Sequence, residues 1–154
     1  MIDKAIEDFL LSQSATFMKP ADSVAVLQAD HKISHAKLLL SQYKYSRVPV
    51  ITHEKHYMGV LGLTEIVDFE MNHDFYYEKS QQTPVSEIMV TDVETVPTIY
   101  QLEDVLKKLV HEPFLPVLEG PVFKGIIVRQ EILKAFNAFI HDFSKDYEIS
   151  RRNR

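Results

Sequence analysis

The chain has 154 residues, of which 45% are hydrophobic and 25% are charged, as in a folded globular protein rather than a disordered one. Cysteine is absent, which excludes disulfides, thiolate metal sites and cysteine nucleophiles. The net charge of −5 argues against nucleic-acid binding, which needs a basic surface. No run approaches the roughly 18 apolar residues of a membrane span, and the first residues lack a basic leader region. We therefore expect a cytoplasmic protein.

The first third of the chain predicts a helix, a strand and a second helix. Ile2, Ile6 and Phe9 share a helical face, which predicts an N-terminal helix within residues 1–14. Residues 17–23 are rich in helix breakers, and the apolar run 24–28 is expected to form a strand. An amphipathic helix is predicted over residues 33–43, with Ser34 as a plausible N-cap.

The central segment predicts a hairpin followed by a helix. An apolar run containing Pro49 leads through a polar loop to Gly59, which opens a second apolar run. A helical pattern begins near Glu65. Residues 72–83 form a polar linker, and Pro84 is expected to start a short helix.

This central segment is written a second time further along the chain. Pro116 follows Pro49 by 67 residues, and Gly125 follows Gly59 by 66. An amphipathic stretch precedes each proline, over residues 33–43 in the first copy and 99–109 in the second. Such regularity indicates a duplicated supersecondary unit of the order β-α-β-β-α. A unit of about 60 residues is marginal alone, so we expect the two copies to share one core.

The doubled unit resembles the cystathionine-β-synthase (CBS) domain over roughly residues 15–140. The resemblance implies an α/β (α+β) fold in which two CBS repeats pack about a pseudo-twofold axis as one Bateman module, with flanking helices at both ends. The expected divisions are 1–14 for the N-terminal helix, 15–71 for repeat 1, 72–83 for the linker, 84–140 for repeat 2 and 141–154 for the end of the last helix with its basic tail. Aromatic residues continue the last helical pattern through Phe143, which suggests subunit packing.

In the CBS fold, ligands bind in clefts where the loops of one repeat face the last strand and helix start of the other. The first predicted cleft consists of Ser23, Val24, Ala25, Tyr45, Ser46, Arg47 and Val48 with Val128, Arg129, Gln130 and Glu131. A second cleft would consist of Thr91, Val93, Thr95, Glu112, Phe114 and Leu115 opposite Gly62, Leu63, Thr64 and Glu65. Only the first contains arginines, which favours phosphate binding there. The alternative is that Arg47 and Arg129 pair with surface acids.

The usual CBS site for AMP or ATP has Ser or Thr three residues before an Asp that holds the ribose. Here Gly62 precedes Glu65, and Val128 precedes Glu131, so both hydroxyls are missing. This departure, together with the terminal helices, resembles the stand-alone CBS proteins of Firmicutes that bind cyclic di-AMP (the CbpB/DarB type). That family commonly has basic residues where this chain has Ser23 and Gln130.

The second resemblance implies roles for residues of the first cleft. The Ala25 backbone would contact adenine, residues 45–48 would surround a base, and Arg129 would lie near a phosphate. It also implies a homodimer whose partner is a stringent-response (p)ppGpp synthetase/hydrolase or pyruvate carboxylase. We therefore predict a regulatory sensor of cyclic di-AMP with no catalytic residues and no cofactor.

Two other readings keep the fold and change the function. The ligand could be AMP, ADP or ATP, or the chain could be an interaction scaffold with both clefts filled. Catalysis is disfavoured because the sequence has no Gly-rich phosphate loop and no nucleophile elbow. His31 and His35 have a spacing that metal sites use, but no third ligand accompanies them, so no metal is expected.

Overall fold

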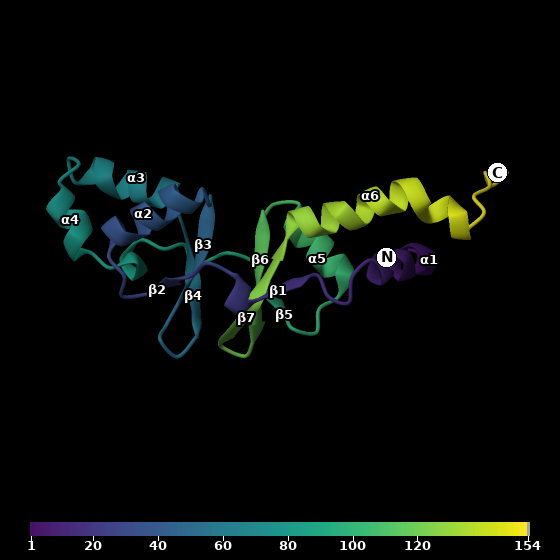
Figure 1. Ribbon diagram of the computed structural model, residues 1–154, viewed down its shortest axis with the longest axis horizontal. Helices are drawn as coiled ribbons and strands as arrows, with labels where there is room; N and C mark the ends of the chain where they lie inside the picture. The colour runs from purple at the N-terminus through teal and green to yellow at the C-terminus, as the bar shows by residue number, and fades with distance from the viewer. Residues whose placement is uncertain (154) are drawn as a thin grey trace.

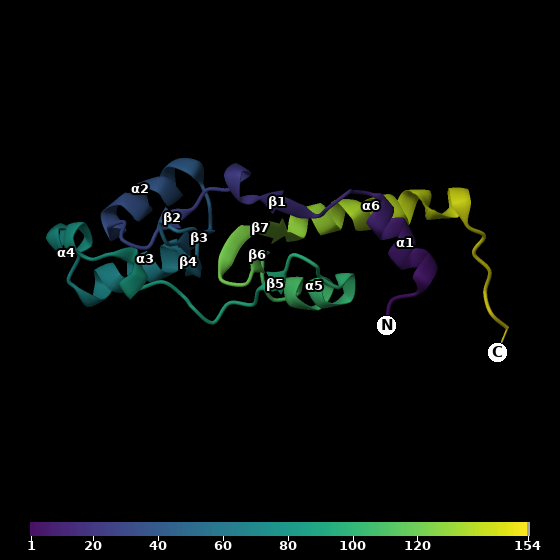
Figure 2. The ribbon, with the colours of Figure 1, turned by 90° about the horizontal axis from the view of Figure 1, so that it is seen from below.

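The computed structural model describes residues 1–153 and contains two small sheets that lie side by side along the long axis of the molecule (Figures 1 and 2). The elements in chain order are α1 (Lys4–Ser12), β1 (Met18–Pro20), the 3-10 turn η1 (Ala21–Ser23), β2 (Leu27–Gln28), α2 (Ile33–Tyr43), β3 (Arg47–Ile51), β4 (Tyr57–Gly62), α3 (Leu63–Asn72), α4 (Tyr77–Gln82), the 3-10 turn η2 (Val85–Glu87), β5 (Val96–Pro97), α5 (Leu102–Leu109), β6 (Phe114–Glu119), β7 (Val122–Val128) and α6 (Arg129–Asp146).

The predicted β-α-β-β-α unit is present twice. In the first repeat, β2 pairs in parallel with β3, and β3 pairs antiparallel with β4. The second repeat has the same pairing among β5, β6 and β7. Helices α2 and α3 accompany the first sheet, and α5 and α6 accompany the second (Figure 1).

Each repeat receives a backbone segment from outside its own unit. Strand β1 precedes the first repeat but pairs antiparallel with β7 of the second, with Met18 opposite Ile127. Equivalently, Val90 at the start of the second repeat bridges Val60 of β4, with backbone bonds of 2.9 and 2.8 Å. The two repeats are therefore interlocked by exchanged segments.

The expectation of one shared core is wrong, because buried apolar residues form two separate clusters. One lies in the second repeat and includes Leu10 and Phe17 from the N-terminal segment. The other lies in the first repeat and includes Val85 from the segment after α4. Each repeat is completed by buried apolar side chains from a segment outside it, so the two cores remain separate.

Three local predictions differ from the structure. The strand predicted over residues 24–28 is confined to β2, and the breaker-rich segment before it contains β1. Helix α2 begins at Ile33 with Lys32 as its N-cap, so Ser34 lies inside the helix and does not cap it. The predicted linker contains the short helix α4.

Helix α6 extends beyond the second sheet, and α1 packs on this extension (Figures 1 and 2). The Phe9 ring lies 5.9 Å from the Phe139 ring and 5.7 Å from the Phe143 ring. Helix α1 therefore covers part of the aromatic surface that the sequence predicts to pack against another subunit. The aliphatic Ile140, on the same helix, is 74% exposed. Within residues 1–153, none of the helices is both long and apolar enough to span a bilayer.

Candidate functional site

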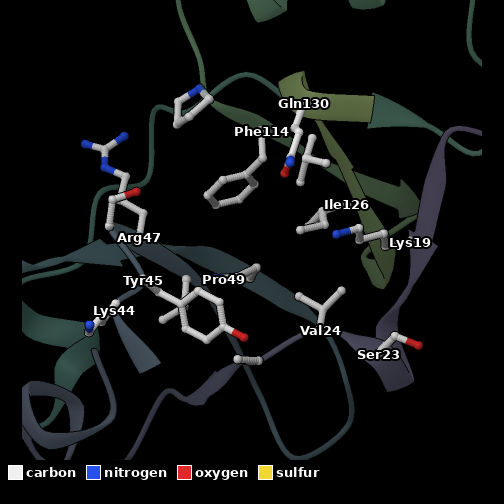
Figure 3. A pocket seen from close by; sticks show the side chains of 15 residues that line it. Lys19, Ser23, Val24, Lys44, Tyr45, Arg47, Pro49, Phe114, Ile126 and Gln130 are labelled. Atoms are coloured by element: carbon white, nitrogen blue, oxygen red, sulfur yellow. The ribbon is translucent and has the colours of Figure 1, made fainter. Parts of the chain in front are cut away.

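A cavity of about 360 Å³ opens between the two repeats (Figure 3). This volume is within the range of about 300–1,000 Å³ that small-molecule sites occupy. The residues that line it are Lys19, Ser23, Val24, Ala25, Lys44, Tyr45, Ser46, Arg47, Val48, Pro49, Pro113, Phe114, Ile126, Val128 and Gln130. The structure thus brings together nine of the eleven residues of the predicted first cleft, and it leaves out Arg129 and Glu131.

Aromatic and aliphatic side chains provide flat walls. Lys44 ends α2 in the left-handed region, with a φ of 56°, and this turn directs the chain into Tyr45. Tyr45 is 43% exposed and faces the cavity opposite Phe114 (Figure 3). Val24 and Ile126 add aliphatic surface, so the cavity offers planar contact to a ring system.

The start of α6 forms one end of the cavity. The Arg129 backbone N–H donates to the Pro113 carbonyl at 3.0 Å, which ties the loop before β6 to the first turn of α6. Gln130 follows and points into the cavity (Figure 3). Because α6 has 18 residues, its N-terminus adds a positive field at this end of the cavity.

The two charged residues of the predicted cleft that lie outside the cavity are engaged elsewhere. Arg129 Nε donates to the Leu109 carbonyl at 2.8 Å, at the C-terminus of α5. Glu131 pairs with Lys134 at 3.0 Å. A phosphate contact by Arg129 stays a prediction. In this structure the side chain binds the last carbonyl group of α5 instead.

The third charged residue of that cleft, Arg47, lines the cavity but directs its guanidinium out of it (Figure 3). Nη2 lies 3.4 Å from Oε1 of Glu65, and Nη1 lies 3.7 Å from Oε2 of Glu112. Both acids belong to the predicted second cleft. The alternative expectation, that the arginines pair with acidic residues, is therefore confirmed for Arg47.

Two lysines that sequence reasoning missed line the cavity. Lys19 lies opposite Ile126 in the β1–β7 ladder, and its amine points toward the middle of the cavity (Figure 3). Lys44 lies at the rim, beside Tyr45. Neither lysine forms an ion pair with any residue in 1–153. Lys19 lies here because β1 pairs with the sheet of the second repeat, and no sequence motif predicts this pairing.

Titratable groups elsewhere do not form a metal centre in the part of the chain that the structure describes. Burial raises the pKa of Tyr57 to about 12, and the neighbouring Glu112 carboxylate acts in the same direction. The His31 and His35 rings lie 4.5 Å apart, and burial, followed by the charge of His35, lowers the pKa of His31. These groups lie outside the cavity.

Two equivalent, interlocked repeats with a cavity of ligand size between them define a tandem-repeat module. A family model for the CBS domain matches residues 15–72 and 85–138. The chain therefore belongs to the CBS domain family, as its repeat predicted.

Within this family, the chain is similar over most of its length to several solved structures and to a curated relative. CbpB from Streptococcus agalactiae superposes with a TM-score of 0.90 at 37% identity, covering 98% of this chain and 96% of that one. A structure of CbpB in complex with c-di-AMP matches with a TM-score of 0.83 at 37% identity, covering 94% and 97%. Cyclic di-AMP receptor B of Bacillus subtilis (strain 168) is 28% identical over 150 residues, covering 94% of this chain and all of the relative.

Proposed function

We propose that this protein is a non-enzymatic sensor that binds cyclic di-AMP in the cavity between its repeats and regulates a partner protein according to occupancy. The observation that carries the proposal is the cavity itself, which combines the aromatic side chains of Tyr45 and Phe114 with two lysines that form no ion pair within residues 1–153. The similarity to a receptor for cyclic di-AMP, and to CbpB in complex with that ligand, supports the choice of ligand.

The chemistry of the cavity suits a dinucleotide with two phosphates. An adenine would pack between Tyr45 and Phe114, whose rings present flat apolar surface. Phosphates would lie toward Lys19 and the start of α6, because the positive charge of Lys19 and the helix N-terminus border the same cavity. Ser23 and Gln130 would supply neutral hydrogen bonds. In this arrangement Lys19 takes the role of the basic residue that the family resemblance places at position 23.

Neither of the two acids at the positions that usually bind ribose is free to accept hydrogen bonds from the ribose of AMP or ATP. Glu65 Oε2 accepts from the Gly62 backbone N–H at 2.8 Å while Oε1 faces Arg47, so this carboxylate is already occupied. Glu131 lies against Lys134, outside the cavity. An open cavity also disfavours the scaffold reading, which required both clefts to be filled by side chains.

Isothermal titration of the full chain with cyclic di-AMP tests the proposal, with AMP, ATP and cyclic di-GMP as comparators. We expect one cyclic di-AMP per chain and weaker binding of the other nucleotides. Lys19→Gln should weaken cyclic di-AMP binding by about tenfold, because it removes one charge-assisted contact to phosphate. Lys145→Gln, at the far end of α6, is the matched control and should leave binding unchanged. Absence of cyclic di-AMP binding by the wild-type chain would refute the proposal.

The same proposal includes a homodimer. It is supported by exposed apolar side chains on the helices of both repeats, namely Leu38, Val67, Met71 and Leu133, and by Val110 directly after α5. The two partner enzymes implied by the family resemblance, and a cytoplasmic location, stay predictions.

A further inference from the structure

The Arg47 side chain is shared between the cavity and a pair of acids behind it. Its stem lines the cavity, yet its guanidinium points away from the middle while Lys19 points toward it (Figure 3). The guanidinium lies 3.4 Å from Glu65 and 3.7 Å from Glu112. Arg47 is therefore a cation beside the cavity that contributes little positive charge inside it.

The two acids hold this position from different repeats. Glu65 lies on α3 of the first repeat, and its carboxylate is fixed by the Gly62 N–H. Glu112 lies in the loop before β6 of the second repeat. Their side chains are only 15% and 21% exposed, so solvent screens their attraction for Arg47 less than it screens an exposed pair. Together the three groups carry a net charge of −1.

The contacts are long enough to be exchanged for better ones. A distance of 3.7 Å is beyond hydrogen-bond length, and 3.4 Å is at its limit, whereas guanidinium–phosphate bonds are roughly 2.7–2.9 Å long. Glu112 also directly precedes Pro113 and Phe114, which line the cavity. A ligand packed on Phe114 would therefore contact the same loop that holds Glu112.

We propose that Glu112 is a positioning residue that holds the Arg47 guanidinium away from the cavity and thereby limits the affinity of the cavity for anionic nucleotides. This inference rests on the proposed function, because it concerns the same cavity. Glu112 is the sharper of the two acids to test, since Glu65 also caps the first turn of α3.

The test is titration of cyclic di-AMP into Glu112→Gln at low and high salt. Removing this carboxylate leaves Glu65 as the single acid beside Arg47, so the guanidinium should turn more readily to a phosphate and binding should tighten by about tenfold, with a steeper loss of affinity as salt rises. The gain should vanish when Arg47→Met is combined with Glu112→Gln, so that the double variant binds like Arg47→Met alone. Glu119→Gln, an exposed acid of the same repeat, should bind like the wild type. Thermal unfolding of each variant tests whether it is folded.

Each result decides the question. Unchanged or weaker binding by Glu112→Gln, or a gain that persists without Arg47, would overturn the inference while leaving the proposed function intact. If the wild type binds no cyclic di-AMP but Glu112→Gln does, the proposed function fails and the role of Glu112 stands. If neither chain binds it, both are overturned.

Discussion

Gly59 and Gly125 occupy equivalent places in the two repeats, where a segment from outside the repeat pairs with the last strand of the sheet. A Cβ atom on Gly59 would collide with the Val90 carbonyl, and one on Gly125 would collide with the Lys19 carbonyl. The regular glycine spacing in the sequence thus reflects close approach between the exchanged backbones.

Because the backbones approach so closely, adding a methyl group at Gly59 should destabilise the protein. Gly59→Ala should lower the free energy of unfolding by about 1–3 kcal/mol, because the Val90 segment must move away from β4. Urea denaturation measures the change. Gly120→Asn is the control, since Gly120 has open space around it and asparagine tolerates its φ of 58°. Equal stability of Gly59→Ala and wild type would contradict the contact.

A pH effect is expected at His31. Its Nδ1 accepts from the Gln28 backbone N–H at 3.1 Å, which requires the neutral ring, and its pKa is lowered from 6.5 by burial and by His35. Asp30 acts against this shift, and His53 acts with it. Because the folded pKa is depressed, this contribution to stability is present above about pH 6.5 and is lost as the pH falls through the lower folded value.

Urea denaturation between about pH 7.5 and about pH 5.5 measures this loss. The wild type should become less stable toward the acid end, and His31→Asn, which cannot titrate, should lose less over the same interval. Parallel curves for the two proteins would show that His31 does not carry the effect.

Sequence reasoning predicted which residues line the cavity better than it predicted where their charged side chains point. Tyr45, Ala25 and Gln130 follow from the repeat, because backbone position is enough to bring them to the cavity. Side-chain direction depends on neighbours that the sequence does not reveal. Arg47 turns to two acids, one from each repeat, and Arg129 turns to the end of α5.

At the scale of single elements, the end of α5 depends on a residue of α6. Arg129 Nε donates to the Leu109 carbonyl, which is one of the carbonyls left without a partner at a helix C-terminus. Positive charge there is also favoured by the helix dipole.

We expect Arg129→Gln to lower the free energy of unfolding by about 1 kcal/mol, because the charged cap of α5 is lost. Urea denaturation without ligand measures it. Lys134→Gln on the same helix removes only a surface pair with Glu131 and should cost less. A larger loss for Lys134→Gln than for Arg129→Gln would argue against the capping role.

Elements with a strong period were predictable, and those made by tertiary pairing were not. The hairpins around Pro49 and Pro116 follow from apolar runs and a glycine. Strand β1 has only three residues and includes Pro20, so nothing local marks it as a strand. It is extended because β7 offers it a partner.

At the scale of the whole molecule, apolar surface remains exposed on α6 and at the end of α5 in the second repeat. Val110 is 70% exposed and Leu133 is 58% exposed, and both line a shallow hollow that also includes Phe136. An apolar hollow of this kind is typical of an interface, here proposed to be that of the homodimer.

Leu133→Glu should therefore weaken self-association, because a carboxylate would be buried against the apolar face of a second copy. Sedimentation velocity of the wild type should show a dimer, and that of Leu133→Glu a larger monomer fraction. Ile99→Glu, at a loop position that is 90% exposed, is the control. A wild-type chain that sediments as a monomer would refute the proposed dimer.

The exchanged strands also set an order on folding during synthesis. The chain emerges from the ribosome N-terminus first, so β1 is made early, yet its partner β7 is among the last strands to be made. The first sheet receives the segment around Val90, but its hairpin also contacts β7, where His56 bridges Val122. All residues of the first core are made before β7, whereas β1 and the hairpin loop at His56 lack their partner strand until β7 is made. A nascent chain stalled before β7 would carry the first core together with an unpaired leading strand, and misassembly would begin at that strand.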